Sequence, residues 1–519
     1  MIAAAFGRRL EAKSTQAKLV MFTCMAIVAL TVAYAVYATA TAPRWIVDDS
    51  FILFRYADNL ANHGQLNWNL GENPVEGYTG ATLVFLLSIA IKLGISPILA
   101  SHVIGIACFF LGGLFILLIL RGFNVGSAVA LALYFAAPFM YTHEWSGLET
   151  TLFAAAMLFS VYAFTSRHRA LFLFSIILLS LTRPEGALLA AILFLIFRPF
   201  SYKSLFIFVT PLLVYFLWRW AYYGRIFPNT YYAKKVATDI FSMKFLVFCL
   251  KTWIRNPAAV PYAGSQSSAL TENVLNVLSF FKEYLLRPAL VVFVLIVWTD
   301  VRRCKYLVFS IGAFCAIALF VYLPFKLEMN FSYRFLAPFY PLVILGLAGI
   351  LKKSDTPLKL ILALALLVVP QIRMNIGGMP AERQYTSTYK ELMDEAHIAI
   401  GEYLRKTFSP NDWLVVHADA GAIPYYSRLK TVDFGRLNDE YLTRKRRSES
   451  EIVDYFFSRN ATAMVLTMEA RPSQNRAREL EAILADPRLG NYTIVKVYGA
   501  DSRPGYSEVL YVRNDLLRH

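Results

Sequence analysis

Long apolar stretches recur along this chain and separate a larger apolar part from a smaller part of mixed character. Such stretches occupy residues 19–40, 101–120, 149–165, 203–221 and 305–323. Because about 20 apolar residues cross the hydrocarbon core of a bilayer as a helix, each stretch predicts a membrane span. Their spacing predicts a polytopic α-helical membrane protein with about 11 transmembrane helices in residues 1–379.

Residues 380–519 follow a different pattern. A helical periodicity over residues 389–408 leads into short runs that are rich in β-branched and aromatic residues. These runs lie at 413–417, 463–467, 492–497 and 509–512. Alternation of such runs with helical patterns is typical of an α/β fold. We therefore expect a soluble C-terminal α/β domain over residues 380–519.

The charge of the chain supports this division. Of 51 Lys and Arg and 35 Asp and Glu, residues 380–519 hold 20 of each, so the whole excess of +16 belongs to the membrane part. Basic residues beside spans mark cytoplasmic loops, which argues against nucleic acid as a partner. A hydrophobic content of 57% excludes a disordered chain. The five cysteines form no CxxC pair and predict neither a disulfide framework nor a zinc site.

The same charges predict the topology. The basic N-terminus places the start of the chain in the cytoplasm, so residues 41–80, the first loop, are expected outside. Residues 222–283 form a large outer loop in this topology. The apolar stretches 81–98 and 101–120 follow one another closely, and the later loops agree with the charge rule only if the two stretches make one net crossing. If both crossed, every later loop would change sides.

An acidic doublet, Asp48 and Asp49, directly follows the first span. Ionisable groups at a membrane are costly unless they are solvated, paired or functional. One carboxylate of such a pair can accept a proton from an attacking hydroxyl while the other positions a substrate or a neighbouring base. The alternative is a solvated helix cap, because Asp is common at the N-cap.

Several blocks of sequence are typical of one enzyme family. They are DDSFILFRYADNLANHGQLNWN (48–69), PVEGYTG (74–80), SGLET (146–150), TRPEG (182–186), FPNTYYAKK (227–235), SYRFLAPFYP (332–341), HADAGAIPYYS (417–427) and TVDFGRLND (431–439). Together they resemble the bacterial polyprenyl-phosphate-dependent glycosyltransferases of the GT-C fold. Among these, the mycobacterial terminal arabinofuranosyltransferases are the most similar. The resemblance covers most of the membrane part and reappears in the C-terminal part.

The resemblance implies an inverting glycosyltransferase in the bacterial cytoplasmic membrane. Such an enzyme takes a sugar, here a pentose such as D-arabinofuranose, from a polyprenyl-phosphate donor. It passes the sugar to an acceptor hydroxyl of a cell-envelope glycan or glycoconjugate. The active site and the C-terminal domain are then expected on the extracytoplasmic face.

The resemblance also implies roles for individual residues. Asp48 or Asp49 is the general base. Phosphate needs Arg or Lys, because guanidinium matches its oxygens and ammonium supplies a point charge. The candidates for the donor phosphate are Arg55, Arg183, Lys234, Lys235 and Arg334. The candidates for sugar or acceptor binding are Glu76, Tyr78, His143, Glu149, Glu185, Asn229, Tyr231, Tyr232, Tyr333 and Asp419.

Several of these assignments have a purely structural alternative. Lys234 and Lys235 could simply snorkel to lipid headgroups. Glu149 could cap a helix, and Asp419, like Asp433, could stabilise a turn. No metal is expected to be obligatory, although the Asp48 and Asp49 pair leaves Mg²⁺ or Mn²⁺ open.

Other functions also remain open at this stage. The same fold could transfer a hexose to lipopolysaccharide, another glycan or a protein. A transporter or flippase would favour inverted repeats and a site near the bilayer centre, which the sequence does not indicate. A scaffold that binds glycan without catalysis would tolerate loss of both aspartates.

Overall fold

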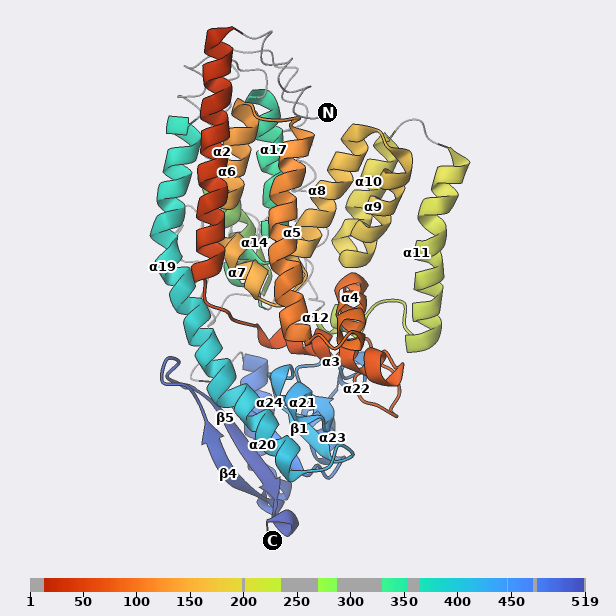
Figure 1. Cartoon of the computed structure of the whole chain (residues 1–519). Coiled ribbons are helices and arrows are strands. Elements are labelled where there is room, and N and C mark those ends of the chain that lie inside the picture. Colours follow the sequence, from red (N-terminus) through yellow and green to blue (C-terminus); the bar gives the residue numbers. More distant parts are fainter. Residues whose placement is uncertain are drawn as a thin grey trace.

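The computed structural model of the protein describes residues 14–197, 201–234, 269–286, 329–351, 364–445, 447–469 and 474–517. Figure 1 shows two layers along the long axis, a bundle of helices and, at one end of it, a smaller α/β domain. The C-terminal strands and their helices lie wholly in the smaller layer. The described N-terminal part of the chain forms the bundle, and the C-terminal part forms the smaller layer.

Four described helical stretches are long and apolar enough to cross a membrane. They are α2 (Thr15–Thr41), α5 (Pro97–Ile119), α11 (Tyr202–Tyr223) and the stretch Phe331–Gly349, which comprises η4 (Phe331–Tyr333), η5 (Ala337–Phe339) and most of α17 (Tyr340–Leu351). A fifth span results if α6 (Val125–Phe135) and α7 (Pro138–Trp145), bent by 56° at their junction, are one broken span. Pro138 starts the second half, which accounts for the break, because proline cannot continue the helical hydrogen bonds. The protein is thus an integral membrane protein.

Shorter apolar helices complete the described bundle. They are α4 (Ala81–Lys92), α8 (Thr150–Ser166), α9 (Arg169–Thr182) and α10 (Pro184–Ile196). Further short elements are α12 (Asn229–Lys234), α14 (Ala269–Phe280), η1 (Phe281–Leu286) and η6 (Leu364–Val368). The span expected at residues 305–323 lies outside the described residues, so the count of about 11 stays a prediction.

Helix α4 is too short to cross the membrane. Its 12 residues extend over about 18 Å, against about 30 Å for the hydrocarbon core. Helix α5, with 23 residues, is long enough. Of the two neighbouring apolar stretches, only the second supplies a full span, in agreement with the single crossing expected there.

The first loop contains helix α3 (Asp48–His63), which lies across the end of the bundle where it meets the C-terminal domain (Figure 1). The helix begins at the acidic doublet and ends at Gly64, whose φ of 67° gives the left-handed conformation of a C-cap. Most of its residues are buried, including the charged Asp48, Arg55 and Asp58. Both layers therefore cover α3.

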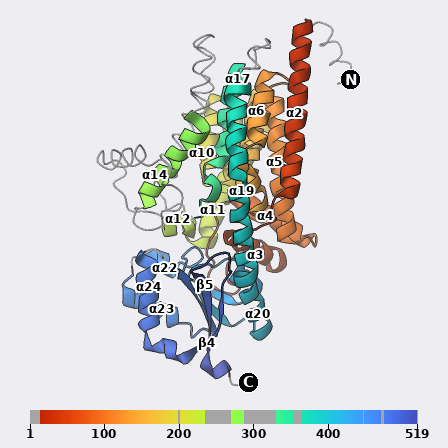
Figure 2. The same cartoon turned by 90° about the vertical axis from the view of Figure 1, so that its left-hand side faces the viewer.

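A continuous helical run connects the two layers. Helix α19 (Val369–Leu392) passes through η7 (Met393–Ile398) into α20 (Ala399–Thr407), and both views show this run descending from the bundle into the C-terminal domain (Figures 1 and 2). The boundary expected at 379/380 falls inside α19. A helix, and not a loop, therefore joins the two parts.

The C-terminal domain is built on a five-stranded sheet of order β2-β1-β3-β5-β4. Strands β1 (Trp413–Val416), β2 (Lys430–Asp433) and β3 (Ala463–Glu469) are parallel, whereas β5 (Tyr506–Arg513) runs antiparallel to β3 and β4 (Tyr492–Tyr498). One apolar core joins the sheet to α20 and α21 (Ala422–Ser427), and a second joins its other face to α23 (Glu449–Phe457) and α24 (Gln474–Ala485). The remaining short helices are α22 (Tyr441–Arg444), η8 (Pro487–Asn491) and η9 (Asn514–Leu516). The α/β class is as expected, and β2 is a strand that the sequence pattern misses.

Candidate functional site

The first loop is fastened to the C-terminal domain through Arg55. Its Nε donates to the carbonyl of Trp68 at 2.8 Å. Its two terminal nitrogens donate to the carbonyls of Pro424 at 2.6 Å and Leu429 at 2.7 Å, and to Asn69 at 3.0 Å. The guanidinium is buried, and its N–H groups donate hydrogen bonds to these partners. Arg55 therefore connects the two parts, and its predicted binding of the donor phosphate would compete with these bonds.

Further hydrogen bonds extend this contact. The Trp68 indole and the Asn69 amide both donate to the carbonyl of Thr431, at 3.2 and 2.9 Å. Lys430 pairs with Glu72 at 3.0 Å. The first loop and the C-terminal domain thus share a surface, as expected if both lie on one side of the membrane.

Asp48 is held by the C-terminal domain on all sides. Its Oδ2 accepts from the backbone N–H of Gly421, and its Oδ1 from that of Ala422, both at 2.8 Å. These N–H groups open helix α21, where the helix dipole favours an anion. A side chain at Gly421 would collide with the backbone and carboxylate of Asp48, so the close approach requires glycine. Asp48 is therefore buried and engaged, which makes it a poor base.

Asp49 has a different environment. Its carboxylate pairs with Arg334 at 3.3 Å and is partly exposed. Burial raises the pKa of Asp49, against the lowering effect of Lys234 and Arg334. A carboxylate with a raised pKa, paired with a guanidinium at the wall of a cavity, is suited to proton transfer. Of the two doublet residues, Asp49 is the one placed to act as a base.

A cavity of about 260 Å³ opens in front of Asp49. Asp49 and Lys234 line it on the side of the membrane part, and Asp419, Asp433 and Glu469 line it on the other side. The last three residues stand at or just after the carboxyl ends of β1, β2 and β3. Crevices outside the carboxyl ends of parallel strands are the usual ligand sites of open α/β sheets. The edge of the sheet at which such domains usually bind ligands thus faces Asp48 and Asp49.

Arg183 lies near the ion pair of Asp49 and Arg334. It forms the junction of α9 and α10, is buried, and pairs with Glu185 at 2.7 Å and with Glu149 at 3.7 Å. The guanidinium carbons of Arg183 and Arg334 each lie 5.2 Å from the centroid of the Phe335 ring. The doublet, Arg334 and Arg183 therefore converge at the same end of the bundle. Glu149 and Glu185 balance the charge of Arg183.

The turn before Arg334 has an unusual backbone. Ser332 and Tyr333 have φ values of 46° and 54°, in the left-handed region that non-glycine residues rarely adopt. His143 stabilises this turn, because its Nε2 lies 3.0 Å from the carbonyl oxygen of Ser332. His143 and Tyr333 therefore shape the approach to Arg334 and do not line the cavity.

Three other predicted sugar contacts are engaged elsewhere. Glu76 pairs with Arg219 at 3.2 Å, and Tyr78 contacts the hydroxyl of Tyr223 at 3.3 Å. The amide nitrogen of Asn229 donates to carbonyl oxygens at 2.9 to 3.0 Å within the C-terminal domain. None of the three lines the cavity. Glu76 and Tyr78 hold the first loop against α11, and Asn229 holds α12 against the C-terminal domain, so their binding to the sugar stays a prediction.

Two tyrosines of the large outer loop also lie away from the cavity lining. Tyr231 stacks on Phe227, with 4.5 Å between the ring centroids. The guanidinium of Arg225 lies over Tyr232. Neither tyrosine lines the cavity, although the neighbouring Lys234 does. Lys235 lies outside the described residues.

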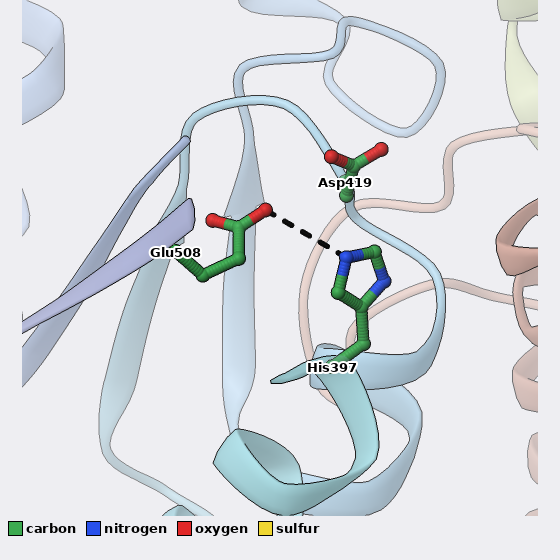
Figure 3. Close-up of side chains that lie close together, drawn as sticks. All are labelled: His397, Asp419 and Glu508. Atoms are coloured by element: carbon green, nitrogen blue, oxygen red, sulfur yellow. Dashed lines mark ion pairs between the residues drawn. The ribbon is translucent and has the colours of Figure 1, made fainter. Parts of the chain in front are cut away.

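The structure adds residues that the sequence did not single out. His397 on η7 lies 3.2 Å from Asp48 through Nδ1. Its Nε2 lies 3.7 Å from Glu508 (Figure 3). Asp419 lies above this pair, and the hydroxyl of Tyr506 contacts His397, Asp419 and Glu508. The three elements involved are far apart in the chain, and a single histidine on a helix carries no sequence signal.

The electrostatics of this cluster follow from its burial. Burial lowers the pKa of His397, but the hydrogen bond to Asp48 and the charges of Asp48, Asp419 and Glu508 outweigh it and raise the pKa to about 9. Burial and the charge of Asp419 raise the pKa of Glu508 to about 8. Burial raises the pKa of Asp433 to about 7, against hydrogen bonds from Asn438. The cluster therefore retains protons at neutral pH.

The residues present do not favour a divalent cation at the doublet. Asp48 already faces two backbone N–H groups and His397, and Asp49 faces Arg334, so the surroundings are positive. His397, Asp419 and Glu508 bring donor atoms within 4.8 Å of one another. The Tyr506 hydroxyl, however, contacts all three and fills the space between them. Hydrogen bonds through Tyr506 connect the three side chains of this cluster.

Comparison with known proteins gives three results. A family model described as a domain of unknown function, DUF8728, matches residues 381–511. The search of curated proteins finds no match. Among solved structures, the chain is similar to ArnT from Cupriavidus metallidurans in the apo state (TM-score 0.46, 10% identity, 94% of this chain and 97% of that chain covered). It is also similar to the same protein bound to undecaprenyl phosphate (TM-score 0.43, 11% identity, with the same coverage).

Proposed function

We propose that the protein is a membrane glycosyltransferase that moves a sugar from a polyprenyl-phosphate donor to a hydroxyl of a cell-envelope glycan. The observation that carries this proposal is that Asp49 lines the cavity beside Lys234 and is paired there with Arg334, which lies behind it. Transfer from a lipid phosphate needs a base for the acceptor and cations for the departing phosphate. The two requirements meet here within one small volume.

The reaction would proceed by a single displacement. The acceptor hydroxyl gives its proton to the Asp49 carboxylate while its oxygen bonds to the anomeric carbon. The bond from that carbon to the phosphate oxygen breaks, and its electrons leave with the phosphate. Arg334 and Lys234 stabilise the charge that develops there, which is the kind of fixed electrostatic help that usually dominates catalysis. With one carboxylate and one displacement, the anomeric centre would be inverted.

Donor binding would also activate the base. Arg334 lowers the pKa of Asp49 through its charge and hydrogen bond. A phosphate bound to Arg334 would offset this effect, so the Asp49 carboxylate would hold a proton more tightly with the donor present. The Asp49 carboxylate would thus have its highest pKa when both substrates are bound.

The position of the site favours an enzyme over a transporter. The charged groups of the cavity lie where the bundle meets the C-terminal domain (Figure 1), whereas transporters bind near the bilayer centre. We place the site and the C-terminal domain on the extracytoplasmic face of the bacterial cytoplasmic membrane, in line with the basic N-terminus. The motifs of the first loop favour a pentose, D-arabinofuranose, as the sugar.

Transfer by the purified protein tests the proposal. Protein in lipid nanodiscs receives a synthetic polyprenyl-phosphate pentose or the matching hexose donor, with an envelope polysaccharide fraction as acceptor. We expect release of polyprenyl phosphate and labelled glycan from the pentose donor. Preference for the hexose donor would overturn the choice of sugar, and no transfer from either donor would overturn the function.

A further inference from the structure

A chain of hydrogen bonds connects the first loop to the sheet of the C-terminal domain. Asp48 Oδ1 lies 3.2 Å from His397 Nδ1, and His397 Nε2 lies 3.1 Å from the Tyr506 hydroxyl. That hydroxyl contacts Asp419 and lies 2.6 Å from Glu508 Oε1. The chain therefore passes from α3 through η7 to β5. Asp48, His397 and Glu508 are buried along it.

The protons of this chain can be assigned without leaving a group unsatisfied. The Tyr506 hydroxyl has one proton and gives it to Asp419. Protonated Glu508 and the Nε2–H of His397 then both donate to the Tyr506 oxygen, and the Nδ1–H of His397 donates to Asp48. The raised pKa values of His397 and Glu508 agree with this assignment. Buried polar groups that satisfy one another in this way hold a single geometry.

The main chain of Asp48 is held as well. Its N–H donates to the hydroxyl of Tyr389 at 3.1 Å, while its carboxylate accepts from Gly421 and Ala422. Tyr389 lies on α19, the helix that continues into His397. With both ends of Asp48 fixed, the following residue, Asp49, is directed towards Arg334. The position of the Asp49 carboxylate thus depends on how the C-terminal domain packs against the first loop.

We propose that His397 and Tyr506 are positioning residues for the transfer reaction, which fix Asp48 and thereby aim the neighbouring base Asp49 into the cavity. This inference rests on the proposed function for its catalytic consequence. Neither residue is assigned a bond to the donor or the acceptor. Their effect reaches the reaction through Asp48.

Two substitutions at His397 separate the two halves of the chain. The amide nitrogen of Asn can occupy the place of Nδ1, so His397→Asn keeps the donor to Asp48 and loses the link to Tyr506. The amide of Gln reaches the place of Nε2, so His397→Gln does the reverse. Tyr506→Phe removes only the hydroxyl. Tyr492→Phe is the matched control, because it also removes one buried hydroxyl, bonded to the Ala461 carbonyl at 2.9 Å, from the same sheet.

The test measures donor turnover and hydrogen exchange on the full-length protein in nanodiscs. We expect His397→Gln to lower kcat by about 10²-fold with little change in the donor KM, because a small misplacement of a reacting group has effects of that size. His397→Asn and Tyr506→Phe should also lower kcat but retain more activity than His397→Gln, since both keep the bond from residue 397 to Asp48 and lose only its support from the sheet. Tyr492→Phe should keep the wild-type kcat.

Hydrogen exchange supplies a measure that does not depend on activity. Peptides containing Asp48 and Gly421 should take up deuterium faster together in His397→Gln and Tyr506→Phe, and not in Tyr492→Phe. Wild-type kcat and exchange in both variants, with an active wild type that Asp49→Asn inactivates, would overturn this inference alone. An inactive wild type would overturn the proposed function instead. A divalent metal bound by the wild type and lost in both variants would replace the hydrogen-bonded chain with a metal centre.

Discussion

Arg334 and Asp49 form an ion pair at 3.3 Å although 285 residues separate them in the chain. The pair joins the stretch that begins at Phe331 to the start of α3. Asp48, the neighbour of Asp49, is held by the C-terminal domain. One small region therefore combines residues from the first loop, the membrane bundle and the sheet. The proposed chemistry depends on this convergence.

Arg334 is expected to act on the departing phosphate. Arg334→Gln should lower kcat by about 10² to 10³-fold, because it removes a fixed charge aimed at the leaving group. Arg334→Lys should fall between Gln and the wild type, since lysine keeps the charge and loses the planar fork. Steady-state turnover of the lipid donor measures this, with Arg513→Gln as the control, because that side chain pairs with Asp515 near the C-terminus and does not line the cavity. Equal activity of all three Arg334 forms would remove Arg334 from the mechanism.

Arg55 is expected to matter for stability and not for donor binding. Arg55→Lys would leave several buried carbonyls without their donor, which should destabilise the protein by about 3 kcal/mol. A lowered melting temperature with an unchanged donor KM is the expected result. Arg444→Lys is the control, because that side chain is 70% exposed. A raised KM at an unchanged melting temperature would return Arg55 to the phosphate.

Gly421 is expected to tolerate no side chain. In Gly421→Ala the new methyl group would meet the backbone and carboxylate of Asp48, so the first loop and α21 must separate. We expect loss of about 1 to 3 kcal/mol of stability and a larger proportional loss of turnover. Gly490→Ala in the same domain is the control, because nothing lies within 4 Å of its added carbon. Equal effects of the two variants would contradict the seating of Asp48 on α21.

The pH dependence of turnover has two expected limbs. Asp49 must be deprotonated to act as a base, and burial raises its pKa, so activity should fail on the acidic side at a pH above its ordinary 3.8. Asp48, Asp419, Glu508 and Tyr506 face His397, whose pKa is about 9 against an ordinary 6.5. The folded protein therefore favours the protonated form. This stabilisation is complete below 6.5 and is lost as the pH rises through about 9.

A profile of kcat/KM against pH checks both limbs. We expect the alkaline limb to disappear in His397→Asn, because that side chain does not titrate. The acidic limb should remain, since Asp49 is unchanged. An alkaline limb that persists in His397→Asn would assign it to another group.

The sequence predicted well those features that depend on local pattern or on shared motifs. Apolar periodicity identified α2 and α5, and Asp49 and Arg334, which the motifs singled out, form an ion pair in the structure. The sequence does not show which groups the guanidinium of an arginine will bond to. Arg55 bonds to carbonyls 369 and 374 residues away, so only the folded chain distinguishes it from a phosphate ligand.

The features that the sequence did not predict have physical reasons of the same kind. Strand β2 has four residues, three of them polar, and is held by pairing with β1 and not by its own propensity. His397 and Tyr506 lie 109 residues apart and meet only because a continuous helix enters the C-terminal domain beside β5. Asn229 was placed in the correct loop, but its amide is used by the carbonyls around Leu437.

The most direct test of the central claim is donor turnover by Asp49→Asn beside Asp58→Asn. Both residues lie on α3, and Asp58, although buried, pairs with Arg428, whose side chain is 45% exposed, so that water solvates the arginine when the carboxylate is removed. Loss of a positioned base should lower transfer from the polyprenyl-phosphate pentose by about 10² to 10⁴-fold. Asp58→Asn should stay near the wild type, and both variants should fold and bind the donor. Wild-type turnover by folded Asp49→Asn would contradict the account.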